Sequence, residues 1–138
     1  MADQKLDLLR RVPLLSGLGD GDLRQIERLA DEVDVPAGTK LTREGEIGHE
    51  FFVIITGRVR VERDGRKVND LGPGDFLGEI ALIDGRPRSA TVVTDEPSRL
   101  LVLAHREFRT LLDSYPQIER QVLQALAGRV RDADPEAS

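Results

Sequence analysis

The sequence lacks cysteine altogether and has only two histidines among its 138 residues. Without cysteine there is no disulfide, no thiolate nucleophile and no cysteine-ligated metal, which is compatible with a reducing compartment. The histidines, His49 and His105, lie 56 positions apart, whereas a metalloenzyme on a β-barrel typically holds two histidines close together with carboxylates. Neither histidine belongs to a recognisable nucleophile-and-base motif. We therefore predict no metal, no cofactor and no catalytic residues.

Long hydrophobic runs and excess positive charge are also missing. No apolar stretch approaches the roughly 18 residues of a membrane-spanning helix, and the opening segment MADQKLDLLRRVPLL is too charged for a secretory signal. The formal net charge of −5 argues against nonspecific nucleic-acid binding, which depends on lysine and arginine neutralising phosphates. These absences predict a cytoplasmic protein with neither a membrane nor a direct nucleic-acid partner.

Apolar residues at helical spacing predict helices at both ends of the chain. In residues 1–32 they recur before Pro13 and again after Asp20, a candidate helix cap. In residues 105–134 one apolar stripe is followed by a second helix, whose start is marked by Ser114 together with a proline in the first turn.

Residues 33–104 change to short β-rich runs separated by glycine, proline and aspartate. Alternation is clearest at 58–62, and Asp64-Gly65 is a two-residue hairpin signal. Many short strands at near-regular spacing favour a closed β-roll or jelly roll over a parallel sheet. The length fits one domain, 1–138. Four phenylalanines are expected in its core: Phe51, Phe52, Phe76 and Phe108.

The segment 76–92, FLGEIALIDGRPRSATV, combines features of an anion pocket. Glu79 opens a short helix-prone stretch that Asp84-Gly85 stops, and Pro87 then delivers Arg88 to a new strand. A helix N-terminus offers free N–H groups, and a guanidinium opposite it can bind two oxygens of one phosphate. Because Glu79 would repel a phosphate, it requires hydroxyl donors nearby, such as those of a sugar.

The strings GEIAL and GRPRSATV in this order and spacing resemble the phosphate-binding cassette of the cyclic-nucleotide-binding domain family. That family includes the sensor modules of catabolite activator protein, protein kinase A regulatory subunits and cyclic-nucleotide-gated channels. The glycines of EGEIGHEFFVIITGRVRV, at Gly45, Gly48 and Gly57, resemble its strand-turn region. The resemblance covers the whole chain and implies an α+β fold: an eight-stranded antiparallel β-roll with N-terminal helices and two C-terminal helices.

The resemblance also implies roles for individual residues. Arg88 would bind the cyclic phosphate and Glu79 the ribose 2′-hydroxyl. Gly78 would let the backbone approach the ligand, and the amides of Ala81 and Ala90 would supplement Arg88. The implied ligand is cyclic AMP first, with cyclic GMP the alternative. The full expected ligand site is Gly78, Glu79, Ile80, Ala81, Arg88, Ser89 and Ala90.

Several alternatives stay open at this point. An isolated arginine would more often be a surface residue paired with Asp84 or Glu79. Ser89 leaves the base preference open. The last helix either closes over the base, through Leu126, Arg129, Val130 and Ala133, or only packs on the roll. The family pattern implies signalling by repositioned C-terminal helices to a protein effector or a second copy. The alternative is a ligand-binding part of a catabolite-activator-type regulator, or of a channel, kinase or transporter.

Overall fold

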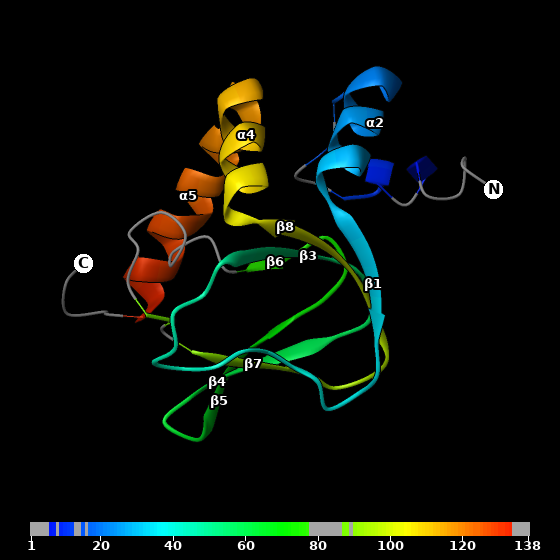
Figure 1. The fold of residues 1–138 in the computed structure, drawn as a ribbon. Coiled ribbons are helices and arrows are strands. Elements are labelled where there is room, and N and C mark those ends of the chain that lie inside the picture. The colour runs from blue at the N-terminus through cyan, green and yellow to red at the C-terminus, as the bar shows by residue number, and fades with distance from the viewer. Residues whose placement is uncertain are drawn as a thin grey trace.

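The computed structural model describes residues 6–7, 9–12, 15, 17–77, 87–88 and 90–133, and in the last helix it describes side chains only as far as Gln124. Within these residues, eight strands form two four-stranded antiparallel sheets, and the helices lie together on one side of them (Figure 1). The expected α+β class, with an eight-stranded roll and flanking helices, is confirmed.

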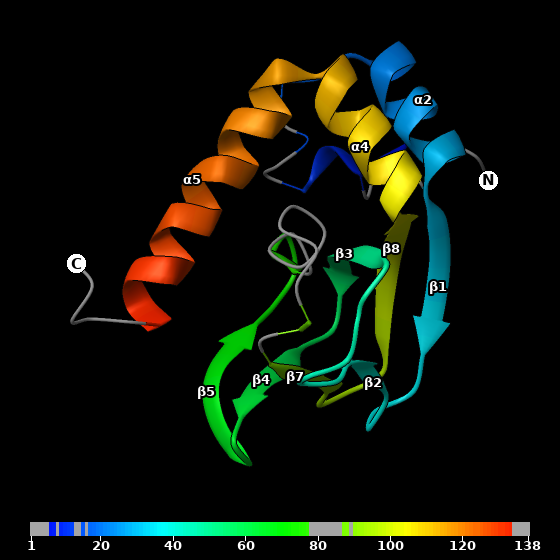
Figure 2. The ribbon, with the colours of Figure 1, turned by 60° about the vertical axis from the view of Figure 1, so that its left-hand side comes forward.

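One sheet has the strand order β1-β8-β3-β6 and the other β2-β7-β4-β5. Figure 2 shows α5 running from the helical layer down beside the roll. In chain order the elements are α2 (Asp20–Leu29), β1 (Asp31–Val35), β2 (Lys40–Thr42), β3 (Glu50–Thr56), β4 (Val59–Arg63), β5 (Arg66–Leu71), β6 (Phe76–Leu77), β7 (Thr91–Thr94), β8 (Ser98–Ala104), α4 (His105–Ser114) and α5 (Pro116–Ala133).

Strand β3 is buried on both faces, which explains its unbroken apolar run FFVII. Successive side chains of a strand point to opposite faces. Phe51, Val53 and Ile55 therefore pack with the helices, while Phe52 and Ile54 pack inside the roll against the second sheet. The strand thus separates two apolar clusters, and both depend on its register.

Phe51 joins the roll to the helical layer. Its ring stacks on that of Phe108 of α4 at a centroid distance of 4.4 Å, and it also contacts Phe76 at 5.6 Å. Phe51, Phe52 and Phe108 are buried, and Phe76 is partly buried against the same cluster, so the expected core phenylalanines are confirmed. Leu9, near the N-terminus, is fully buried in this cluster too.

The β4–β5 hairpin turns at Asp64-Gly65, as predicted. Arg63 pairs with Arg66, which leaves a two-residue turn whose φ angles are +54° and +77°. Two positive φ angles are typical of a type I′ turn, whose twist matches that of the strands.

The predicted helix caps were displaced by one residue. Asp20 is the first residue of α2, and Gly19 is its N-cap. Ser114 is the last residue of α4 and not the cap of α5. The Tyr115 carbonyl accepts hydrogen bonds from the N–H groups of Ile118 and Glu119, so Tyr115 takes the cap position, and Pro116 opens α5, where no N–H is needed.

Tyr115, at the α4–α5 junction, contacts α2 through its hydroxyl, which donates a long hydrogen bond of 3.4 Å to Asp22 Oδ1. Burial raises the pKa of the Tyr115 hydroxyl, and the negative charge of Asp22 raises it further.

We expect Tyr115 to titrate above the usual tyrosine value of about 10. Because it is the single tyrosine of a chain without tryptophan, the ultraviolet absorbance of tyrosinate follows Tyr115 alone. Asp22→Asn should lower the midpoint, and Glu96→Gln in the β7–β8 turn should not; an unchanged midpoint in Asp22→Asn would contradict the contact.

No helix in the described part of the chain combines the length and apolar character needed to cross a membrane.

Candidate functional site

Arg88 is a buried cation between β6 and β7. Its exposed fraction is 7%, so the alternative of a solvent-exposed arginine is wrong. It lies three residues before β7, in irregular backbone rather than in the strand itself. Burying a guanidinium is costly unless polar groups surround it, because the group keeps its charge at any physiological pH. The structure therefore holds a permanent positive charge inside a chain of net negative charge.

The β2–β3 loop (residues 43–49) fixes the backbone of Arg88. The N–H of Arg88 donates to the Glu46 carbonyl at 2.7 Å, and the N–H of Gly45 donates to the Arg88 carbonyl at 2.9 Å. These two bonds run in opposite directions between the same short segments, as in an antiparallel strand pair. The position of the Arg88 Cα is thus set by a segment some forty residues earlier in the chain.

The guanidinium of Arg88 is held by the first residue of β3, which follows the same loop. Its Nη2 donates to the backbone carbonyl of Glu50 at 2.6 Å, where β3 begins. A guanidinium carries five N–H donors in a planar fork, so a bond to one carbonyl orients the plane of the whole group. Gly48 lies against the same guanidinium.

The residues after Arg88 are held by β2 and the loop that follows it. The hydroxyl of Thr42, itself buried, donates to the carbonyl of Ala90 at 2.9 Å. The N–H of Glu44 donates to the hydroxyl of Thr91 at 3.0 Å. The loop therefore supports the backbone of this segment at Arg88, and the end of β2 supports it at Ala90. The expected binding of phosphate by the Ala90 amide stays a prediction.

Five of the seven expected site residues lie outside the described residues: Gly78, Glu79, Ile80, Ala81 and Ser89. Their expected contacts with a ribose and a cyclic phosphate therefore stay predictions. The lid candidates Leu126, Arg129, Val130 and Ala133 lie in α5, where the backbone is described and the side chains are not.

Sequence reasoning missed three parts of the site: the Thr42 hydroxyl and the carbonyls of Glu46 and Glu50. Two of these are backbone groups, which no residue type announces. The signal that was available is the glycine pair at Gly45 and Gly48, which marks the loop but does not say what it touches.

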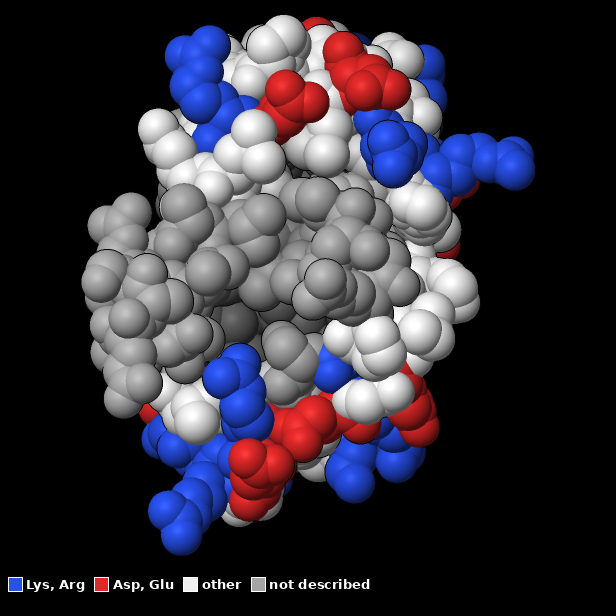
Figure 3. Space-filling view, turned by 90° about the vertical axis from the view of Figure 1, so that its left-hand side faces the viewer, with Lys and Arg blue, Asp and Glu red and all other residues white. Residues whose placement is uncertain are grey.

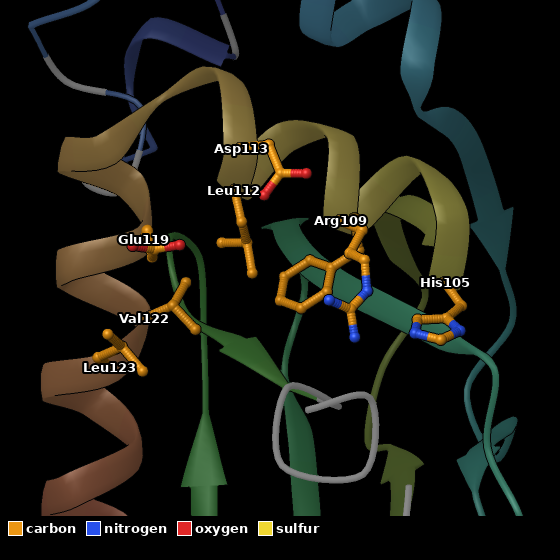
Figure 4. A pocket seen from close by; sticks show the side chains of 8 residues that line it. His105, Arg109, Leu112, Asp113, Glu119, Val122 and Leu123 are labelled. Atoms are coloured by element: carbon orange, nitrogen blue, oxygen red, sulfur yellow. The ribbon is translucent and has the colours of Figure 1, made fainter. Parts of the chain in front are cut away.

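A groove of about 370 Å³ separates α4 from α5 (Figure 4). Phe108, Leu112 and Val122 form its apolar part, and the side chains of His105 and Arg109 project from α4 at one end. The two helices expected to move on binding line this groove and also pack together in the buried cluster that contains Leu111 and Ile118. No group of three or more His, Asp or Glu side chains among the described residues is arranged to hold a metal ion.

Charged side chains of both signs are interspersed on the face shown in Figure 3. On or beside the second sheet, Lys67 pairs with Asp70 at 2.6 Å, and Arg60 pairs with both Glu62 and Asp95. Among the described residues of this face the two signs are mixed, unlike the continuous basic stripe typical of nucleic-acid-binding surfaces.

Comparisons with known proteins agree with this fold. A cyclic nucleotide-gated potassium channel of Rhizobium etli is 42% identical over 115 residues, which cover 83% of this chain and 32% of the channel. The crystal structure of the catabolite activator protein of Thermus thermophilus has a TM-score of 0.79 and 30% identity, and the match covers 91% of this chain and 61% of that one. The regulatory domain of Toxoplasma gondii PKA, solved with cAMP, has a TM-score of 0.67 and 32% identity. The match covers 79% of this chain and 43% of that one.

This chain therefore spans between about a third and three fifths of the length of these relatives. Residues 32–115 match the family described as the cyclic nucleotide-binding domain. That match includes the loop, Arg88 and both sheets, and the expected resemblance is confirmed: this chain belongs to the cyclic nucleotide-binding domain family.

Proposed function

We propose that this chain binds a cyclic nucleotide, with cyclic AMP the preferred ligand and cyclic GMP the alternative. The observation that carries the proposal is the buried guanidinium of Arg88, oriented by the Glu50 carbonyl. A planar cation held in this way suits two oxygens of one phosphate. A cyclic phosphate has two exocyclic oxygens and a single negative charge, which one arginine can balance.

The remaining predicted contacts follow the family pattern. We assign Glu79 to the ribose 2′-hydroxyl, Gly78 to close backbone approach, and the amides of Ala81 and Ala90 to the phosphate. Ile80 and Ser89 complete the site, and Ser89 bears on the choice of base. We further propose that the whole chain, 1–138, forms one such domain and carries no catalytic residue, since the relatives described above are channels and regulators by name.

The signal would leave the pocket through α4 and α5. A ligand shifts an equilibrium between helix positions only by its differential affinity for them. The half-exposed Leu123 of α5 supports contact of this helix with a protein effector or a second copy. We keep the localisation as cytoplasmic, with no direct nucleic-acid contact by this part of the protein.

A sensor part of a larger protein is the second candidate. It is favoured by the channel of Rhizobium etli, in which the matching segment is only 32% of the length. A transcription regulator of the catabolite-activator type would likewise carry a helix-turn-helix beyond the ligand-binding part. The open reading frame of the gene separates these cases, because an effector region would be encoded beside residues 1–138.

Calorimetric titration tests the proposed binding directly. We expect saturable heat with cyclic AMP and weaker binding of cyclic GMP. Adenosine 5′-monophosphate is the matched control: it shares the base and sugar, but its open phosphate carries a second negative charge, so it should bind more weakly than the cyclic form. Absence of heat with both cyclic nucleotides at millimolar concentration would contradict the proposal.

A further inference from the structure

Gly48 lies directly against the guanidinium of Arg88. A Cβ atom added at Gly48 would lie 1.7 Å from Nε, 2.2 Å from Cζ and 2.4 Å from Nη2 of Arg88. Non-bonded heavy atoms of this kind sit about 3.5–4.0 Å apart. The guanidinium therefore occupies the space that any other amino acid at position 48 would need for its side chain.

Space, and not backbone conformation, is what requires glycine at this position. Gly48 is not among the described residues with a positive φ, so its backbone is open to other residues. Gly45, three residues earlier in the same loop, is the reverse case. Its φ is +85°, and a Cβ there would meet no atom within 4 Å. Two glycines of one short loop thus have separate tasks: Gly45 shapes the turn, and Gly48 leaves room for Arg88.

We propose that Gly48 is a positioning residue for the anion site, and that it acts only through the guanidinium of Arg88. This inference rests on the proposed function for its effect on ligand affinity. With Gly48 beneath it, the guanidinium reaches the Glu50 carbonyl at 2.6 Å. A side chain at position 48 would push the group off this carbonyl by more than an ångström, which exceeds the tolerance of about 0.5 Å for a productive binding geometry.

The clash in Gly48→Ala falls on the far end of a long, flexible side chain. The arginine can swing away, so the fold should survive, while the cation no longer stands where the phosphate needs it. We expect the dissociation constant for cyclic AMP to rise at least about tenfold, because charge-assisted hydrogen bonds weaken steeply with poor geometry. Gly21→Ala, on the exposed side of α2 with no atom within 4 Å of the added Cβ, is the matched control and should bind as the native chain does.

A readout without nucleotide tests the positioning itself. In a ¹H–¹⁵N spectrum of the free protein, the Nε–H signal of Arg88 is identified by its loss in Arg88→Ala. We expect Gly48→Ala to shift that signal and Gly21→Ala to leave it in place. We also expect the effects of the two substitutions on the thermal midpoint to be non-additive. Gly48→Ala should lower the midpoint less in the Arg88→Ala variant than in the native chain, because the guanidinium no longer fills the space. If Gly48→Ala acted only on the loop backbone, it would lower the thermal midpoint equally in the native chain and in Arg88→Ala.

The outcomes separate this inference from the proposed function. If the native chain binds cyclic AMP and Gly48→Ala binds it within about twofold of native, the positioning role is overturned. If the native chain does not bind cyclic AMP at all, the proposed function fails. The measurements on the free protein then decide whether Gly48 positions Arg88. A shifted Arg88 signal in Gly48→Ala together with a non-additive cycle supports the positioning role of Gly48, and an unshifted signal overturns it.

Discussion

The Arg88→Ala variant is expected to bind cyclic AMP about 30- to 5,000-fold more weakly than the native chain, which corresponds to about 2–5 kcal/mol. The reason is that Arg88 is 7% exposed and oriented by the Glu50 carbonyl. A phosphate bound there exchanges its water for this cation, and without the cation it would be buried with no compensating charge. Calorimetry, or competition against a fluorescent cyclic nucleotide, measures the change.

Arg88→Lys separates charge from geometry. Lysine keeps the positive charge but loses the planar fork that grips two oxygens and that the Glu50 carbonyl orients. The affinity of Arg88→Lys for cyclic AMP should lie between that of the native chain and that of Arg88→Ala. Arg99→Ala is the control, because Arg99 of β8 is a partly exposed arginine that pairs with Asp34 and Glu32 on the outside of the roll. A loss below about threefold in Arg88→Ala would show that Arg88 does not anchor the phosphate.

Much of the fold could be predicted because local patterns and tertiary environment agree. The Asp64-Gly65 turn has one physical requirement, two positive φ angles, and the residues present satisfy it. The run FFVII is apolar at every position because both faces of β3 are covered. The cap of α5 was misplaced because Ser114 has a better cap side chain than Tyr115, but α4 extends through Ser114 and leaves Tyr115 as the junction.

The site was predictable only in part, for a different reason. Arg88 could be singled out because it stands in the string GRPRSATV, which resembles the phosphate-binding cassette of the family. The groups that hold Arg88 in place could not be predicted. The bond from Arg88 to Glu50 joins residues 38 positions apart and uses a backbone carbonyl, and the contact with Gly48 consists of an absent side chain. Such contacts depend on how β2 and β7 pair, and periodicity within one segment carries no information on pairing between segments.

The Gly57→Ala variant is expected to destabilise the fold by about 2–6 kcal/mol, the sum of backbone strain and overpacking. Gly57 follows β3 of one sheet and precedes β4 of the other, so the chain changes sheets there. Its φ is +106°, and an added Cβ would lie 2.1 Å from Oγ and 2.7 Å from the Cα of Ser98. Unlike the clash at Gly48, this one involves backbone, which can move away only if β8 moves.

A loss of this size is a large share of the roughly 5–15 kcal/mol by which domains are stable. Because the chain has no tryptophan, urea unfolding followed by far-ultraviolet circular dichroism is the suitable measurement. Gly65→Ala is the matched control: its φ is +77°, but no atom lies within 4 Å of an added Cβ. It should cost only the backbone strain, about 1–3 kcal/mol. Equal losses in the two variants would mean that the contact with Ser98 does not constrain the crossing between sheets, whereas a larger loss at Gly57 would assign the difference to the approach of β8.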